Sequence, residues 1–230
     1  MTARETTDGA GELLIARHGQ AHCNLTGVIA GPATCIGLTP LGRAQAQALA
    51  ARLQNEARDS PVTEVHASPR RRGQETAEII AHALALHVQY HDDLRDPDYG
   101  PAAEGRTWTD LLAAFSGDPT ACPELPLAHG GEPWTASATR VMQVLTRLRA
   151  GDPSGRILVV GHAETVKAAY HLFLGIPARQ PLPIKLTVAN ASLTTWRPTG
   201  ATHANGVGRW TLVAHNDISH LATATATARS

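Results

Sequence analysis

Three short apolar runs in this chain are each followed by the start of a helical pattern, and this alternation limits the fold more than any other feature. The runs lie at residues 12–16 (ELLIA), 63–67 (TEVHA) and 156–160 (RILVV), and their length and content are typical of buried strands. Strands that alternate with helices form largely parallel sheets with helices on both faces. The sequence therefore predicts an α/β fold, a three-layer α/β/α sandwich with a mostly parallel central sheet.

Helix-start signals and apolar spacing predict four helices. A Thr-Pro pair and a Ser-Pro pair supply the first turns of the first two helices. The four helices are expected over about 39–55, from 68 to about 84, over about 135–149 and from 162 onward. In the first helix the expected inward stripe consists of Leu41, Ala44, Ala48 and Ala51.

Two further strands are expected near the end of the chain. Residues 186–196 and 209–215 alternate between apolar and polar side chains, and a Gly-rich turn around Gly206 and Gly208 joins them. These strands extend the sheet at one side.

The chain has 230 residues, which suits one domain with a sizeable core. We expect that domain to cover residues 11–220. The flanking segments, 1–10 and the low-complexity tail 221–230, are expected to be flexible.

The stretch 92–133 differs from the rest of the chain. It is rich in Pro, Gly and Asp and only weakly periodic. We expect it to run over one end of the sheet as an excursion on the substrate side, where Tyr99 and Trp108, together with Trp134, line the pocket.

Charge and cysteine content exclude several classes of protein. Twenty Lys and Arg balance twenty Asp and Glu, so no basic surface for nucleic acid or an anionic membrane is expected. The three cysteines form no CxxC pair, which disfavours a disulfide scaffold or a structural zinc site. No signal sequence and no apolar run of about 20 residues is present. These features predict a cytoplasmic protein.

Cationic and imidazole side chains follow all three of the predicted buried strands. Arg17 and His18 come after the first strand, the arginine run that contains Arg72 after the second, and His162 after the third. Ligands of open α/β sheets bind beyond the carboxyl ends of the strands, so these side chains are expected to converge. A neutral histidine attacking phosphorus, with arginines binding the phosphoryl oxygens, is the chemistry that this set supports.

The motifs around these residues are ordered along nearly the whole chain. They read LLIARHGQAHCN from Leu13, GLTPLGRAQAQALAARL from Gly37, SPRRRGQETAEII from Ser68 and ILVVGHAETVKA from Ile157, with NASLTTW and NDISHL later. In this order they resemble the histidine phosphatase superfamily, in the branch of cofactor-dependent phosphoglycerate mutases and small-molecule phosphatases. The resemblance implies a phosphoglycerate mutase-like fold.

The resemblance also assigns roles to residues of this chain. It makes His18 the phosphorylated nucleophile and places Arg17, Arg72 and His162 in the phosphate pocket. Asn24 becomes a further ligand of the phosphoryl oxygens, and His22 a residue facing the substrate. Arg70 and Arg71 do not align with the motif arginine and are expected on the solvated surface of the helix.

The general acid is assigned by resemblance to an L-x-E segment, which reads Leu94-Arg95-Asp96 here. Asp96 is the first choice and Glu104 the competitor. Two further carboxylates are expected near the substrate. Glu164 follows the second histidine, and Glu132 stands in a GGEP segment that resembles the family's GGES.

The leading hypothesis is a metal-independent phosphatase that hydrolyses the phosphate monoester of a small metabolite through a phosphohistidine. A phosphoglycerate-type mutase and a non-catalytic phospho-ligand binding protein are the alternatives. No cofactor and no metal site are expected, and neither is a nucleic-acid or membrane partner. A homodimer is left open, because nothing in the sequence speaks to it.

Overall fold

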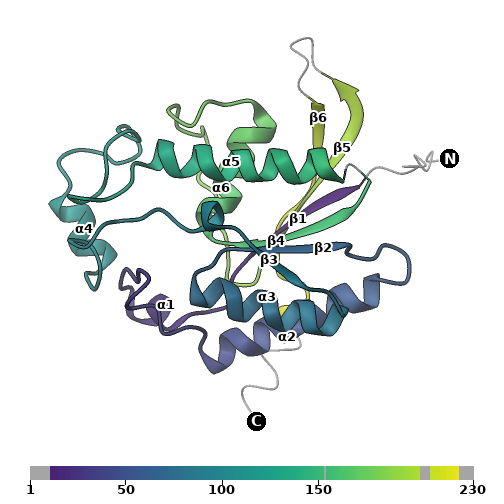
Figure 1. The fold of residues 1–230 in the computed structure, drawn as a ribbon. Coiled ribbons are helices and arrows are strands. Elements are labelled where there is room, and N and C mark those ends of the chain that lie inside the picture. Colours follow the sequence, from purple (N-terminus) through teal and green to yellow (C-terminus); the bar gives the residue numbers. More distant parts are fainter. Residues whose placement is uncertain (1–10, 153, 203–207, 223–230) are drawn as a thin grey trace.

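A six-stranded mixed sheet forms the centre of the computed structural model, which describes residues 11–152, 154–202 and 208–222 (Figure 1). The strand order is β3-β2-β4-β1-β5-β6. The first four of these pair in parallel, whereas β5 is antiparallel to both β1 and β6. The strands are β1 (Glu12–Arg17), β2 (Glu64–Ala67), β3 (Val88–Tyr90), β4 (Arg156–Gly161), β5 (Leu193–Thr202) and β6 (Gly208–Asp217).

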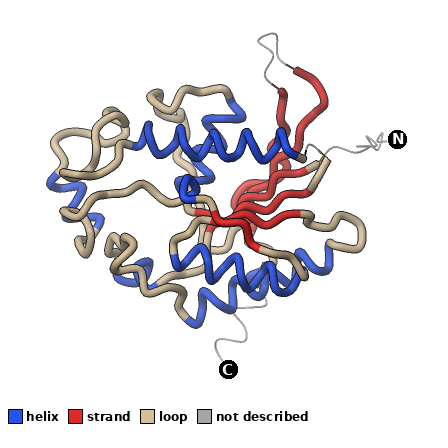
Figure 2. The backbone as a smooth tube through the Cα atoms, viewed as in Figure 1, coloured by secondary structure: helices blue, strands red, loops and turns tan. Residues whose placement is uncertain are grey.

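Helices cover both faces of the sheet. On one face α5 and α6 share a core with β1 and β4, and on the other α2 and α3 pack against β1, β2 and β4 (Figures 1 and 2). The helices are α1 (His22–Thr26), α2 (Pro40–Glu56), α3 (Arg71–Leu84), the 3₁₀ turn η1 (Asp92–Leu94), α4 (Trp108–Ala114), α5 (Trp134–Gly151) and α6 (Ala163–Leu174). The predicted three-layer α/β/α sandwich is confirmed.

The three buried strands and four helices expected from the sequence are all present, with shifts of a few residues at their ends. Thr39 caps α2 as expected, because its hydroxyl accepts a hydrogen bond from the Gly42 amide at 3.0 Å. Strand β3 was not predicted, since a strand of only three residues carries no readable alternation.

The strand expected over 186–196 begins only at Leu193. The residues before it form a loop, and Ala191 has a φ of 55°, in the left-handed region that strands exclude. This loop lies against the end of β1, where the Ala191 amide donates to the His18 carbonyl at 3.1 Å. Contact with the site has replaced strand pairing over these residues.

The inward face of α2 is also different from the expected one. The buried residues are Gly42, Ala46, Leu49, Ala50 and Leu53, whereas Ala51 is exposed. Because α2 carries alanine on every face, the spacing of its small residues does not single out one stripe.

Residues 92–133 run over one end of the sheet, and most of this segment is loop (Figure 2). The segments expected to be flexible, 1–10 and 221–230, lie outside the described residues except for 221 and 222, and so does the turn at Gly206. None of the described helices is both long and apolar enough to cross a bilayer.

Two glycines let the first turn of α2 approach the loop that follows β1. A Cβ on Gly19 would lie 2.3 Å from the Gly42 carbonyl oxygen, and one on Gly42 would lie 2.0 Å from the Gln20 carbonyl oxygen. Neither neighbour is a flexible side chain, so only glycine fits at the two positions. This close contact holds the His18 loop in place.

The change Gly42→Ala is therefore expected to lower the free energy of unfolding by about 1–3 kcal/mol, the usual cost of forcing an extra methyl into packed backbone. Gly151→Ala is the matched control, because a Cβ there meets nothing within 4 Å. Chemical denaturation of both variants measures the difference. Equal stability of the two would contradict the close packing.

Candidate active site

The side chains predicted to converge do so at the carboxyl edge of the parallel strands. Arg17 ends β1 and His18 follows it, Arg72 lies in the first turn of α3 after β2, and His162 follows β4. All four line one cavity of about 210 Å³. Its other lining residues are Cys23, Asn24, Val28, Ile29, Ala30, Asp96, Tyr99, Trp108, Ala163 and Glu164.

His18 is buried and held in one orientation. Its Nδ1 lies 2.7 Å from the Gly19 carbonyl oxygen, which can only accept, so Nδ1 carries the proton and donates. Burial, together with the charges of Arg72, His162 and Arg17, holds the pKa of His18 well below its usual range. The ring is therefore neutral, and Nε2 keeps a free electron pair, as a nucleophile requires.

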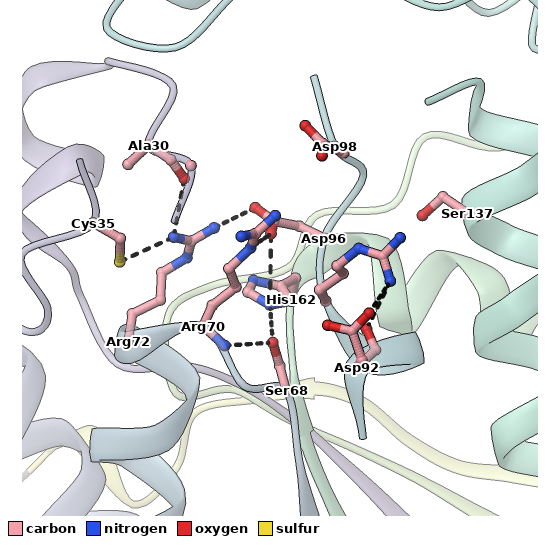
Figure 3. A network of polar contacts seen from close by, with 12 residues as sticks. Ala30, Cys35, Ser68, Arg70, Arg72, Asp92, Asp96, Asp98, Ser137 and His162 are labelled. Carbon is pink, nitrogen blue, oxygen red and sulfur yellow. Dashed lines mark hydrogen bonds and ion pairs between the residues drawn. The ribbon is translucent and has the colours of Figure 1, made fainter. Parts of the chain in front are cut away.

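His162 lies beside His18. The two ring centroids are 5.3 Å apart with the rings inclined at 65°. The Nε2 atom of His162 is 2.8 Å from the Ser68 hydroxyl oxygen at the end of β2 (Figure 3). Burial and the charges of Arg72 and Arg70 lower the pKa of His162 as well, so this ring is also neutral.

Two arginines hold Asp96 at the edge of the cavity. The Arg70 Nε donates to one carboxylate oxygen at 3.0 Å, and Arg72 pairs with the other (Figure 3). His162 Nε2 is 4.0 Å from the same carboxylate. Asp96 thus lies between the two arginines that follow β2 and His162, and it lines the same cavity.

The expectation that Arg70 lies on the solvated surface is wrong, because the residue is only 8% exposed. Arg70 precedes α3 with extended backbone, so its side chain leaves the end of β2 toward Asp96 and not along the helix surface. Its place in the short segment between β2 and α3 was the available signal. Arg71, by contrast, is exposed and pairs with Glu75 as a surface residue does.

Arg17 and Arg72 present cationic groups to the cavity. Arg72 Nη1 donates to the Ala30 carbonyl at 3.3 Å and to Cys35 Sγ at 3.2 Å, which fixes the guanidinium plane. Arg17 Nη1 donates to the Val188 carbonyl, while its buried Nε has no hydrogen-bond partner among the described residues. An unpartnered donor and a fixed fork of N–H groups suit the oxygens of a bound phosphoryl group.

An ion pair between Glu132 and Arg140 holds the backbone of the segment that carries Asp96. Glu132 accepts from Arg140 at 2.8 and 2.7 Å, and these bonds hold the pKa of Glu132 below its usual range against the opposite effect of burial. Arg140 also donates to the backbone carbonyls of Asp93, Arg95 and Asp96 at 2.7, 2.7 and 3.0 Å. Arg140 lies in a helix with ordinary spacing, so the sequence carried no signal for this role.

The other predicted site residues divide into three groups. Asn24 and Glu164 line the cavity, and Glu164 lies 3.6 Å from Lys167. Glu104 is bonded to the Thr34 amide and hydroxyl at 3.1 and 2.8 Å and lines a neighbouring cavity that also contains Asp96. His22 is outside the lining of the His18 cavity. Among the described residues, no three His, Cys, Asp or Glu side chains are grouped so as to hold a metal ion.

The two neutral histidines predict how stability depends on pH. In the unfolded chain they take up protons below about pH 6.5, whereas in the fold their lowered pKa keeps them neutral to more acidic pH. The unfolded state then binds more protons, so the free energy of unfolding falls on acidification, with a limiting slope of about 1.4 kcal/mol per pH unit for each histidine.

Chemical denaturation between about pH 7 and pH 5 measures this slope. His18→Asn is expected to reduce it, while His82→Asn, an exposed position on α3, leaves it unchanged. A wild-type protein whose stability stays level over this interval would contradict the prediction.

Comparisons with known proteins agree on one family. The model of the histidine phosphatase superfamily (branch 1) matches residues 13–226. Phosphoglycerate mutase-like protein 4 of Arabidopsis thaliana is 27% identical over 91% of this chain and 86% of that protein. A metal-independent phosphoserine phosphatase of the same plant is 30% identical over 69% of this chain and 67% of that protein.

A solved structure shares the fold over most of its length. The mycobacterial glucosyl-3-phosphoglycerate phosphatase in complex with VO3 superposes with a TM-score of 0.74 at 25% identity, covering 90% of this chain and 99% of that one. The chain spans 51% of the length of a bifunctional protein of Mycobacterium tuberculosis, to which it is 30% identical.

Proposed function

The chain belongs to the histidine phosphatase superfamily, and from this premise we propose that it hydrolyses a phosphate monoester of a small metabolite through a phosphohistidine on His18. The observation that carries the proposal is the neutral, oriented His18, whose Nε2 is free in a cavity lined by two arginines. The phosphatases among its relatives support the same reaction.

In the first step His18 Nε2 attacks phosphorus, and the bond from phosphorus to the ester oxygen breaks. Arg17, Arg72 and His162 bind the nonbridging oxygens and stabilise the charge that develops on them. Asp96 gives its proton to the departing alcohol oxygen, so the leaving group departs as a neutral alcohol. The phosphoryl group is then bonded to His18.

In the second step a water molecule attacks the phosphohistidine. Asp96, now ionised, accepts the proton of that water, and the bond between phosphorus and His18 Nε2 breaks. Inorganic phosphate leaves, and both His18 and Asp96 return to their starting forms.

The ion pairs of Asp96 with Arg70 and Arg72 fit this cycle. The guanidinium of Arg72 serves two groups, because it pairs with Asp96 and also lines the cavity in which the phosphate would bind. A phosphate dianion that engages Arg72 draws this partner from Asp96 and adds negative charge beside it. The carboxyl oxygen that Arg72 releases can then face the departing alcohol oxygen. Arg70 continues to hold the group in position.

Release of phosphate from p-nitrophenyl phosphate, with and without EDTA, tests the proposal. We expect turnover that chelation does not change, because arginine and histidine supply the charge stabilisation here. A strict requirement for added metal would overturn the proposal. Transfer to an acceptor that needs a bisphosphate primer would instead identify a mutase, and tight phosphate binding without turnover a binding protein.

A further inference from the structure

The cavity around His18 continues into a groove with aromatic and proline walls. A second cavity of about 370 Å³ shares Tyr99, Trp108 and Glu164 with the first. Its other walls are Pro97, Pro119, Pro123, Leu125, Leu127, Glu132, Trp134 and Lys167. A substrate whose phosphate lies at His18 therefore extends its leaving group between Trp108 and Trp134.

The groove continues beyond Trp134. A third cavity of about 770 Å³ shares Pro119, Pro123, Trp134 and Lys167 with the second, and Leu182, Ile184 and Leu186 line its far part. Both volumes lie in the usual range of ligand pockets, about 300–1,000 Å³. The second and third cavities together are called the aromatic groove below.

Packing fixes the aromatic walls. Tyr99 and Trp108 meet edge to face with ring centroids 4.9 Å apart, and Trp134 stacks obliquely on His171 at 5.9 Å. Trp134 also packs against the core that α5 and α6 share. Rings held in this way offer fixed apolar faces at little further cost in conformational freedom.

The charges of the groove disfavour a second anionic group next to the phosphate. Among the described residues, no arginine lines either of its two cavities, and the lysines that do are Lys167 and Lys185. Lys167, which lines both cavities, lies 3.6 Å from Glu164, and Arg140 forms an ion pair with Glu132. In the second cavity, next to the phosphate, a carboxylate or second phosphate on the leaving group would thus meet Glu164 paired with Lys167 and Glu132 paired with Arg140. Lys185 lines only the third cavity, which shares no lining residue with the cavity around His18.

Resting on the phosphatase activity proposed above, we propose that the substrate is the monophosphate ester of an aromatic alcohol without a second anionic group. Its phosphate binds at His18, and its ring lies in the aromatic groove between Trp108 and Trp134. Burial of the ring against these walls supplies the binding energy that a second charged group supplies in bisphosphate or phosphocarboxylate substrates.

Two primary alkyl phosphates test this inference, because their alcohols are leaving groups of similar strength. We expect kcat/KM for 2-(indol-3-yl)ethyl phosphate to exceed that for glycerol 1-phosphate by about 100-fold. Trp108→Ala is expected to lower this ratio about tenfold, since it removes one aromatic wall. Leu212→Ala, an exposed apolar residue on β6, is the control and leaves the ratio unchanged.

The possible outcomes separate the two proposals. Equal kcat/KM for the two esters, or preference for glycerol 1-phosphate, would overturn the aromatic substrate while the phosphatase activity stands. If neither ester is hydrolysed while p-nitrophenyl phosphate is, the aromatic substrate is overturned and the phosphatase activity stands. If p-nitrophenyl phosphate is not hydrolysed either, the phosphatase proposal fails, and calorimetry with the matching phosphonates decides the groove separately. If the protein binds the indolylethyl phosphonate more tightly than the phosphonate analogue of glycerol 1-phosphate, and Trp108→Ala removes this difference in affinity, the groove is supported. Equal affinity for the two phosphonates would overturn it.

Discussion

Replacing His18 with alanine is expected to lower the rate of phosphate release by about 10⁴-fold or more, the scale on which enzymes lose activity with their nucleophile. The change removes Nε2, the atom that bonds to phosphorus, and no other described side chain replaces it in the same position. Arg17, Arg72 and His162 remain, so inorganic phosphate is expected to bind still. Steady-state turnover of p-nitrophenyl phosphate and calorimetric titration with phosphate measure the two effects.

His82→Ala is the control for this change, because His82 is exposed on α3 and lies outside the lining of the cavity. It is expected to keep wild-type turnover. Acid-labile, base-stable phosphate bound to the wild-type protein after rapid mixing with substrate, and missing in His18→Ala, would mark the phosphohistidine. Retention of more than about a tenth of the activity by His18→Ala would show that His18 is not the nucleophile.

Replacing Asp96 with asparagine is expected to produce a loss that depends on the leaving group. For an alkyl phosphate kcat should fall about 10²- to 10⁴-fold, because the departing alkoxide receives no proton. For p-nitrophenyl phosphate the first step needs no acid, since nitrophenolate leaves unprotonated. We therefore expect a burst of one nitrophenol per protein molecule, followed by slow turnover as water attacks the phosphohistidine without a base.

The change Glu104→Gln tests whether Glu104 or Asp96 is the general acid, a choice that the sequence left open. Glu104 is bonded to the loop at Thr34 and lines the neighbouring cavity, so this change is expected to leave the leaving-group dependence as in the wild type. A burst in Glu104→Gln and none in Asp96→Asn would reverse the assignment. A uniform loss on both substrates in Asp96→Asn would indicate that Asp96 only holds Arg70 and Arg72 in place.

The order of elements and the layers followed from the sequence because the signals are local. The apolar runs before Arg17, Ser68 and His162 are long enough to read as buried strands, and each is followed by a residue pattern that starts a helix. Where the signal was weak, the prediction failed. The alanines of α2 did not reveal its inward face, and the three residues of β3 were too few to show alternation.

The position of the two cavity histidines also followed from the sequence, but their environment did not. His18 and His162 come directly after parallel strands, so sheet geometry alone brings them to one edge. Contacts across long sequence separations decided the rest. Arg70 turns from the helix surface to Asp96, and Arg140 reaches the carbonyls of the Asp96 segment from α5.

The sequence by itself thus determined the α/β sandwich, the family and the pair of histidines, because strand order and motif spacing are properties of the chain read locally. Only the tertiary structure decided that Asp96, and not Glu104, lines the cavity around His18, and which side chains form the walls of the adjoining groove. Both depend on how 92–133 folds over the sheet against α5 and α6. That packing brings residues from separate elements, such as Trp108 and Trp134, to the walls of one cavity, which no local pattern encodes.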